Sequence, residues 1–407
     1  MATDKMTLKL LFSLVLCTAI CLAEDPEEKM TVPEIIKFWG YPAETYATIT
    51  QDGYVLTMHR IPYGKAGRGK SNRPVAFLQH GLLCSSSNWV TNLPEQSLAF
   101  MLADAGYDVW MGNVRGNTYS TAHVEYARND SRYWAFSWDE MAKYDLPAMI
   151  NHALFISGQK SLYYVGHSQG TMMAFSGLSM NKELADKVNI FFALAPVAKV
   201  AHTKSPIRYL AYFTPLIKIM FGELGVEDFM PSTKLVQWLA EKMCPEEATV
   251  CDNILFLLSG YDISNLNKTR VPVYFSHTPA GTSVQNILHY GQMILSQKFQ
   301  AYDYGTEKNL VKYGKTSPRQ YSLKDLKTPV YAYSGGQDWL ADPQDVKWLM
   351  SQVPHLIKHR MIAKYNHLDF IWGEDAHSKV YHSIIRTMAK YERQKQGEIK
   401  HKKRNGN

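Results

Sequence analysis

The chain has 407 residues, of which 46% are hydrophobic and 20% charged, a balance typical of folded globular proteins and not of disordered ones. Its length exceeds that of a simple single domain, so we expect two domains or one domain with a large insertion. The net charge of +7 does not indicate a nucleic-acid-binding protein, because residues 389–407 alone carry seven Lys/Arg against two Glu.

The N-terminal segment has the features of a secretory signal peptide. Lys5 and Lys9 precede an apolar run at residues 10–22, and the small residues Cys21 and Ala23 form a cleavage site before residue 24. The run is too short to span a membrane, and no later stretch reaches 18 uninterrupted apolar residues. We therefore predict a signal peptide at 1–23 and a secreted protein without a transmembrane segment.

The pattern of apolar runs predicts an α/β fold. Residues 44–50 and 54–61 alternate in hydrophobicity around Asp52-Gly53, which indicates a β-hairpin. Helix-length segments separate most of the compact apolar runs that follow. Short apolar strands alternating with helices predict a mostly parallel sheet covered on both faces. These runs lie at residues 75–79, 108–111, 162–165, 190–194, 330–333 and 360–363.

One interval is several times longer than a normal crossover connection, between the strand ending near residue 195 and the strand beginning near residue 330. We predict that residues 200–324 form a helical cap inserted into a core domain made of 24–199 and 325–390. Within this cap, residues 230–260 contain two apolar runs and are the candidate lid. The alternative is that both runs are permanently buried in the cap.

Three cysteines remain after the signal peptide. Cys244 and Cys251 have only six residues between them, and secretion permits a disulfide, so they are the predicted pair. Cys84 is expected to be a buried and inert thiol. The sequons at Asn129 and Asn267 are candidate glycosylation sites.

The nucleophile of a hydrolase is indicated by Gly166-His167-Ser168-Gln169-Gly170. The pentapeptide follows a predicted strand and opens a predicted helix at 171–180, which is the context that a nucleophile elbow requires. The alternative is a buried serine between two turn glycines. An oxyanion would need two backbone donors, for which we select the N–H groups of Gln169 and of Leu82, in the His80-Gly81-Leu82 loop.

A serine nucleophile needs a histidine base oriented by a carboxylate, and in this fold the chain order is Ser, acid, His. Asp338 follows the strand at 330–333 in a glycine-rich loop, and His367 follows the strand at 360–363. Asp342 precedes Pro343 at a helix start and is better interpreted as an N-cap. The other candidates considered were Asp325, Asp345, His355, His359, His377 and His382, together with His80 and His167, which precede Ser168.

Several of these motifs resemble the acid lipase family, which includes gastric lipase, lysosomal acid lipase and many insect lipases. The resemblance spans residues 31–391 and lies in the segments FLQHGLL at 77–83, NVRGN at 113–117, GHSQG at 166–170, PAGTSVQ at 279–285 and NHLDF at 366–370. It implies neutral-lipid ester hydrolysis, a secreted or lysosomal location, a helical cap with a lid, and triad roles for Ser168, Asp338 and His367. It also implies a cap disulfide matching Cys244 and Cys251. The basic segment 391–407 lies outside the resemblance, and we predict that it is disordered.

The leading functional hypothesis is a monomeric triacylglycerol or sterol-ester lipase that acts transiently at a lipid–water interface without metal or cofactor. A soluble short-chain carboxylesterase is one alternative, and it would lack a large lid. A non-catalytic lipid-binding or storage protein is another, although such relatives normally lose a triad residue. The complete candidate triad and the long insertion favour the lipase.

Overall fold

The structure is a computed structural model that describes residues 25–69, 72–212, 228–229, 260 and 265–405. Three sequence predictions lie wholly or almost wholly outside these residues: the signal peptide, the candidate lid, and the disulfide between Cys244 and Cys251. Within the described chain, no helix has both the length and the apolar composition needed to cross a membrane.

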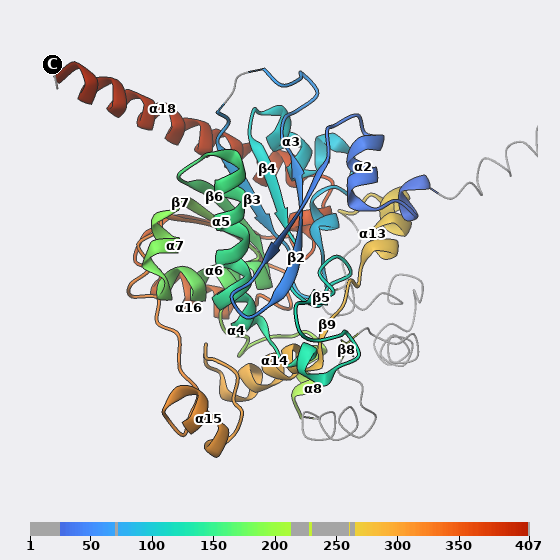
Figure 1. Cartoon of the computed structure of the whole chain (residues 1–407), viewed down its shortest axis with the longest axis vertical. Coiled ribbons are helices and arrows are strands. Elements are labelled where there is room, and N and C mark those ends of the chain that lie inside the picture. The colour runs from blue at the N-terminus through green and yellow to red at the C-terminus, as the bar shows by residue number, and fades with distance from the viewer. Residues whose placement is uncertain (1–24, 70–71, 213–227, 230–259, 261–264, 406–407) are drawn as a thin grey trace, which may run out of the picture.

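The described chain is built on one large, mostly parallel sheet, as the sequence predicts (Figure 1). The strand order is β1-β2-β4-β3-β6-β7-β10-β11, and β5 pairs with β2. The hairpin strands β1 and β2 are antiparallel, β2 is antiparallel to β4 and β5, and the remaining neighbours are parallel. The strands are β1 (Glu44–Ile49), β2 (Tyr54–Ile61), β3 (Val75–Gln79), β4 (Asp108–Gly112), β5 (Ala122–His123), β6 (Leu162–His167), β7 (Val188–Leu194), β10 (Val330–Gly335) and β11 (Leu356–Ile362).

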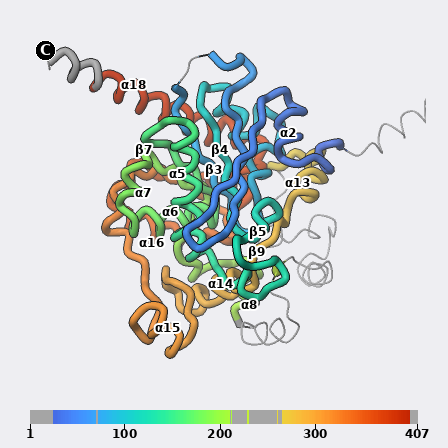
Figure 2. Tube along the Cα trace, in the orientation of Figure 1, coloured from blue at the N-terminus to red at the C-terminus, as the bar shows by residue number. Residues whose placement is uncertain are grey.

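Helices cover the sheet, and a second group of helices follows β7 in the chain. The first group is α2 (Val32–Phe38), α3 (Leu98–Asp104), α4 (Trp138–Glu140), α5 (Leu146–Ser157), α6 (Gln169–Met180), α7 (Lys182–Asp186), α16 (Pro343–Gln352), α17 (Asp369–Trp372) and α18 (His382–Asn405). The second group is α8 (Ile207–Tyr212), α13 (Val271–His277), α14 (Val284–Ser296) and α15 (Thr306–Tyr313), with the short strands β8 (Asp228–Phe229) and β9 (Thr282–Ser283). Helices α8, α14 and α15 gather at the end of the molecule opposite the C-terminus (Figure 2).

The burial of the strands explains which of them could be found from sequence. Every residue of β3, β4 and β6 is buried, because helices cover both faces of the central strands. In contrast, β11 is an edge strand with five exposed residues in succession, and it begins at Leu356, four residues before the predicted start. An edge strand tolerates charged side chains such as Lys358 and His359, so no apolar run marks its first half.

The C-terminal segment differs from its prediction. Helix α18 continues through Asn405, so residues 391–405 are helical where the sequence analysis predicts disorder. The segment is rich in Lys, Arg, Gln and Glu, which have favourable helix propensities, and it extends a helix that is already nucleated on the core. High charge in this segment therefore does not by itself predict an unfolded chain.

A buried arginine ties the β1–β2 hairpin turn to the segment before α5. The guanidinium of Arg115 donates to both carboxylate oxygens of Asp52, at 2.7 and 2.8 Å, and its Nε donates to Asp145 at 2.7 Å. It also lies 3.8 Å from the centre of the Tyr54 ring. Arg115 and Asp145 are both buried, so removing one partner leaves the other charge without compensation in the core.

We predict that Arg115→Leu lowers the free energy of unfolding by about 3–5 kcal/mol, because it leaves the Asp145 carboxylate buried and unpaired. Arg132→Leu is the matched control, since Arg132 pairs with Asp130 on the surface and its removal should cost at most about 1 kcal/mol. Urea denaturation followed by circular dichroism measures both. Equal losses for the two variants would contradict the role assigned to Arg115.

Candidate active site

The three residues predicted as a triad lie at the same edge of the sheet. Ser168 directly follows β6, Asp338 lies in the loop after β10, and His367 lies in the loop between β11 and α17. Strands β6, β7, β10 and β11 are parallel neighbours, so their carboxyl ends meet at one edge. Residues up to 199 positions apart in sequence are therefore brought together there.

These side chains form one continuous line of hydrogen bonds. Ser168 Oγ lies 2.7 Å from Nε2 of His367, and Nδ1 of His367 lies 2.9 and 3.0 Å from the two carboxylate oxygens of Asp338. A carboxylate can only accept, so Nδ1 carries the ring proton and Nε2 is left to accept from the serine hydroxyl. All three residues are buried. This arrangement can deprotonate a serine hydroxyl as it attacks a carbonyl.

The turn at Ser168 explains the two glycines of the pentapeptide. Ser168 has φ = 54° and ψ = −120°, a conformation that costs on the order of 1–3 kcal/mol for a residue with a side chain. A Cβ on Gly166 would lie 2.8 Å from the carbonyl group of Gly170, and a Cβ on Gly170 would lie 2.5 Å from the carbonyl oxygen of Gln79. Side chains at these positions would push the turn away from its neighbours, so glycine is required at both.

The carboxylate is held by its own loop. One oxygen of Asp338 accepts from the backbone N–H groups of Leu340 at 2.9 Å and Ala341 at 2.8 Å. The carbonyl of Trp339 accepts in turn from the backbone N–H of Lys204, at 2.9 Å, and from the Thr203 hydroxyl, at 2.8 Å. Residues 203 and 204 therefore fasten the loop that carries Asp338. The sequence analysis missed this contact, and no local signal marks it.

Of the two predicted oxyanion donors, Gln169 directly follows Ser168 and Leu82 lies in the loop after β3. Gln169 is the first residue of α6, where backbone N–H groups have no carbonyl partner within the helix. Leu82 follows Gly81, where an added Cβ would lie only 3.0 Å from Cβ of Ser168. Close approach of this loop to the serine therefore requires glycine at position 81.

Helix α14 covers the nucleophile turn, which the sequence analysis did not predict. The Gln169 side-chain oxygen accepts from the Asn286 amide at 2.9 Å and from the Tyr290 hydroxyl at 3.1 Å. Both residues are buried. Asn286 directly follows the segment at 279–285 that resembles the acid lipases, so that motif was the available signal.

His167 has a role in the site that the sequence analysis did not predict. Chain order argues against it as the base, but its Nε2 lies 2.9 Å from the backbone carbonyl of His367. A carbonyl only accepts, so Nε2–H of a neutral His167 donates to it. Burial lowers the pKa of His167 to about 3, which keeps the ring neutral in mildly acidic surroundings. His167 thereby holds the main chain of His367 in place.

Other Asp and His residues that were candidates for the acid or the base of the triad lie elsewhere in the structure. Asp342 accepts from the backbone N–H of Gln344 at 2.8 Å and caps α16, in agreement with its interpretation as an N-cap. His359 pairs with the Ser334 hydroxyl at 2.8 Å, and Asp345 pairs with His202 at 2.8 Å. His382 begins α18 and is exposed.

The remaining site predictions concern thiol and sugar chemistry. Cys84 is a buried free thiol, and burial raises its pKa to about 12, so the reactive thiolate is scarce. Asn129 is exposed, and Asn267 is partly exposed at the start of a short 3-10 helix. Both sequons stay predicted glycosylation sites.

The chain matches two protein families and is similar in sequence to known lipases. Residues 32–93 match a family described as a partial α/β-hydrolase lipase region, and residues 74–217 match the α/β-hydrolase fold. Lysosomal acid lipase/cholesteryl ester hydrolase of Homo sapiens is 50% identical over 91% of this chain and 93% of the relative. Gastric triacylglycerol lipase of Bos taurus is 49% identical over 90% and 93%, respectively.

Solved structures of lower identity share the fold. A monoglyceride lipase from Saccharomyces cerevisiae superimposes with a TM-score of 0.53 at 14% identity, covering 91% of this chain and 99% of that chain. An epoxide hydrolase from Vigna radiata gives a TM-score of 0.50 at 14% identity, covering 86% and 98%. These two proteins catalyse different reactions, so their likeness shows the fold alone.

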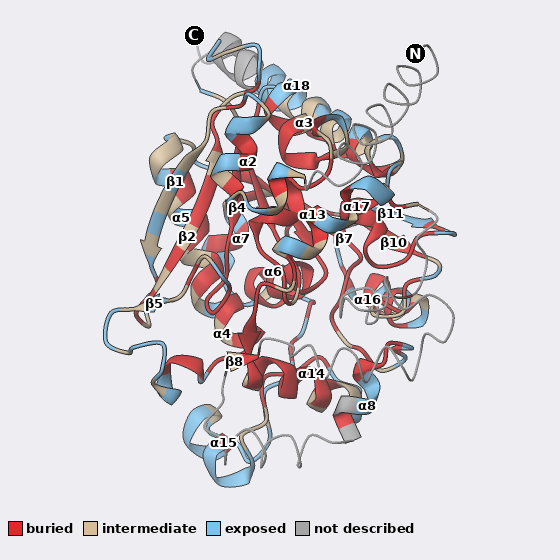
Figure 3. Ribbon diagram, turned by 90° about the vertical axis from the view of Figure 1, so that its right-hand side faces the viewer, coloured by how far each residue is buried: buried red, intermediate tan, exposed pale blue. Residues whose placement is uncertain are grey.

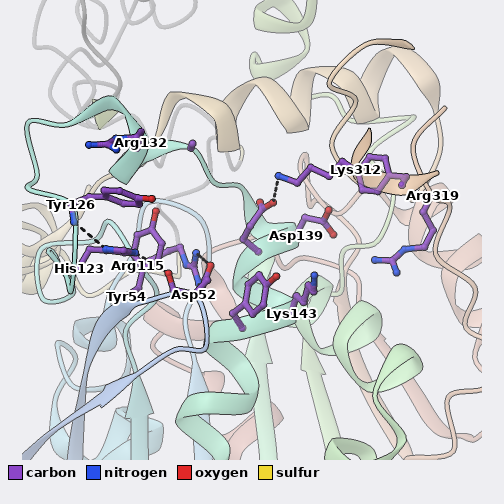
Figure 4. Close-up of a pocket in the computed structure, with 14 residues that line it drawn as sticks. Asp52, Tyr54, Arg115, His123, Tyr126, Arg132, Asp139, Lys143, Lys312 and Arg319 are labelled. Atoms are coloured by element: carbon purple, nitrogen blue, oxygen red, sulfur yellow. Dashed lines mark hydrogen bonds and ion pairs between the residues drawn. The ribbon is translucent and has the colours of Figure 1, made fainter. Parts of the chain in front are cut away.

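A polar cavity of about 390 Å³ lies apart from the triad (Figure 4). Asp139 lies between Tyr54 and Arg115 on one side and Lys312 and Arg319 on the other. Burial, reinforced by the neighbouring Glu140 carboxylate, raises the pKa of Asp139 to about 7, although the two cations oppose the shift. Asp139 is therefore mostly protonated in mildly acidic surroundings and charged above neutrality.

We predict that Asp139→Asn stabilises the protein more at pH 8 than at pH 5. Because burial raises the pKa of Asp139 from 3.8 to about 7, the folded state loses stability progressively as pH rises between these two values, whereas asparagine does not titrate. The relative gain at pH 8 should be on the order of a few kcal/mol. Thermal melts from pH 5 to 8 measure it, with Asp186→Asn, an exposed residue, as control. A difference that does not change with pH would refute this assignment.

Proposed function

Because this chain belongs to the acid lipase family of α/β-hydrolases, we propose that Ser168, His367 and Asp338 are the triad with which it hydrolyses lipid esters. The family makes the protein an ester hydrolase of neutral lipids that is secreted or lysosomal. The observation that carries the triad assignment is the unbroken hydrogen-bonded line from Ser168 to Asp338.

Acylation begins when His367 Nε2 takes the hydroxyl proton of Ser168. The serine oxygen attacks the ester carbonyl, and negative charge develops on the carbonyl oxygen, which the N–H groups of Leu82 and Gln169 stabilise. The tetrahedral intermediate collapses, the C–O bond to the alcohol breaks, and His367 returns the proton to the departing alcohol. The acyl group is then esterified to Ser168.

Deacylation repeats these steps with water as the nucleophile. His367 removes a proton from the water, the hydroxide attacks the acyl carbonyl, and the fatty acid leaves as Ser168 recovers its proton. Asp338 keeps the proton on Nδ1 of His367 and stabilises the imidazolium that forms in each half-reaction. The contact from His167 to the carbonyl of His367 keeps the ring within reach of Ser168.

We also propose that residues 200–324 form a cap over this site and that the protein acts as a monomer at a lipid–water interface. The contacts of α14 with Gln169 support a cap that reaches the nucleophile turn. The hydrogen bonds from residues 203–205 to Trp339 support a cap fastened to the acid loop. A cap of this kind excludes water from the acyl-enzyme.

Ser168→Ala should lower kcat by about 10⁵-fold or more while leaving the thermal midpoint nearly unchanged, because it removes only the nucleophilic oxygen. The rates are measured on emulsified long-chain triacylglycerol, cholesteryl ester and a soluble short-chain ester. Ser176→Ala is the matched control, because it removes a buried hydroxyl from α6, the helix that directly follows Ser168. A residual rate within tenfold of wild type would exclude Ser168 as the nucleophile, and activity confined to the short-chain ester would favour a carboxylesterase.

Asp338→Asn should lower kcat by about 10⁴-fold, because the amide no longer holds the productive tautomer of His367. Asp342→Asn is the control: it keeps a side-chain oxygen that can cap α16, so its activity should stay within about threefold of wild type. The same three substrates serve as the assay. If Asp342→Asn were the more damaging change, the acid of the triad would have to be reassigned.

A further inference from the structure

Helix α15 presents two adjacent aliphatic side chains to solvent. Leu310 is 55% exposed and Val311 is 90% exposed. Figure 3 shows α15 as a largely exposed helix projecting beyond α14 at the lower end of the molecule. Transfer of such an exposed aliphatic pair from water into an apolar phase is favourable.

Positive charge surrounds this apolar pair. Between residues 305 and 320 the only acidic residue is Glu307, whereas the basic residues number four, so the segment carries +3. These four are Lys308, Lys312, Lys315 and Arg319, and all are exposed. Lys312, Lys315 and Arg319 also line a hollow of about 540 Å³ beside the helix. Anionic groups are the ligands that such a set of cations attracts.

Buried hydrogen bonds hold α15 in this position. The Asn309 side chain is buried, accepts from the backbone N–H of Tyr304 at 2.9 Å, and donates to Asp303 at 2.7 Å. The Tyr313 hydroxyl donates to the carbonyl of Tyr302 at 2.9 Å. The exposed face of the helix is therefore oriented by its buried face, and Leu310 and Val311 are held outward.

The helix is also connected to the site of the proposed reaction. The Gln292 side chain exchanges two hydrogen bonds of 2.8 Å with the backbone of Asp303, which joins the α15 segment to α14. The same α14 carries Asn286 and Tyr290, the two residues that contact Gln169. A surface that engages α15 would therefore lie at the same end of the molecule as the helix covering the nucleophile.

We propose that α15 docks the protein on an anionic lipid surface. In this arrangement Leu310 and Val311 enter the acyl region of the lipid, and the four basic side chains meet phosphate-bearing headgroups. We call these six residues the α15 surface: Lys308, Leu310, Val311, Lys312, Lys315 and Arg319. The proposal rests on the proposed function, since a lipase must reach lipid in bulk. The basic end of α18 lies at the opposite end of the molecule and would face away from the docked lipid (Figure 1).

Vesicle binding tests the apolar half of the α15 surface. Sedimentation with phosphatidylcholine vesicles, with and without 30% phosphatidylserine, should show binding that requires the anionic lipid. Leu310→Gln with Val311→Gln should weaken vesicle binding about tenfold, because the two aliphatic side chains that would insert into the lipid are lost. Phe155→Gln is the control, since Phe155 is 82% exposed on α5, outside the α15 surface. Wild-type binding by the double variant would overturn the proposal.

Charge reversal tests the other half independently, should the first variant fold poorly. Lys308→Glu with Lys315→Glu should weaken binding at least tenfold and reduce its dependence on salt. Lys390→Glu with Lys395→Glu changes the net charge equally but lies on α18, and it should bind as wild type does. An equal loss in the α18 variant would mean that net charge or the α18 end carries the binding, and the proposal would be wrong.

Activity separates this proposal from the proposed function. Both α15 variants should hydrolyse a soluble short-chain ester within twofold of wild type, while their rate on triacylglycerol emulsions coated with phosphatidylserine falls with binding. If wild type hydrolysed no ester, the proposed function would fail although the vesicle result would stand. If wild type hydrolysed esters but did not bind anionic vesicles, only the docking proposal would fail.

Discussion

The conformation of Ser168 is the constraint on which the rest of the site depends. A residue with a side chain is held at positive φ between a strand and a helix, and this is possible only where the neighbouring chain approaches without a Cβ. Gly166, Gly170 and Gly81 supply that close approach on three sides. The strain is offset by burial of β6 and α6 in the core, so the sheet holds the hydroxyl where His367 can reach it.

Neutral and charged groups have separate tasks around this turn. His167 is kept neutral by burial and acts through its N–H, while Asp338 receives two backbone N–H groups on one oxygen and presents both oxygens to His367. The chain after β7 contacts the site at two places, because α14 contacts Gln169 and residues 203–205 hold Trp339. Changes in this part of the chain should therefore reach Ser168 and Asp338 through these contacts.

Sequence reasoning succeeded where one physical signal was local and strong. The strands at 75–79 and 162–165 are apolar because both faces of the central sheet are covered, and the G-x-S-x-G spacing reflects the steric limits of one turn. It failed for the first half of β11, whose exposed edge carries charge, and for α18, whose basic composition indicates solvation without indicating disorder. The contacts of Asn286 and Tyr290 with Gln169 join residues more than a hundred positions apart, so the motif at 279–285 could mark this region but could not predict its partner.

The proposed reaction depends on Ser168 as the one nucleophile and on His367 as the base that activates it. Diethyl p-nitrophenyl phosphate reacts covalently with an activated serine of this kind, and peptide mass spectrometry locates the added diethylphosphoryl group. We expect stoichiometric modification of the peptide containing Ser168, with loss of hydrolysis in step, and no modification in His367→Ala under the same conditions. Modification of a different serine, or full hydrolytic activity after Ser168 has been modified, would contradict the account.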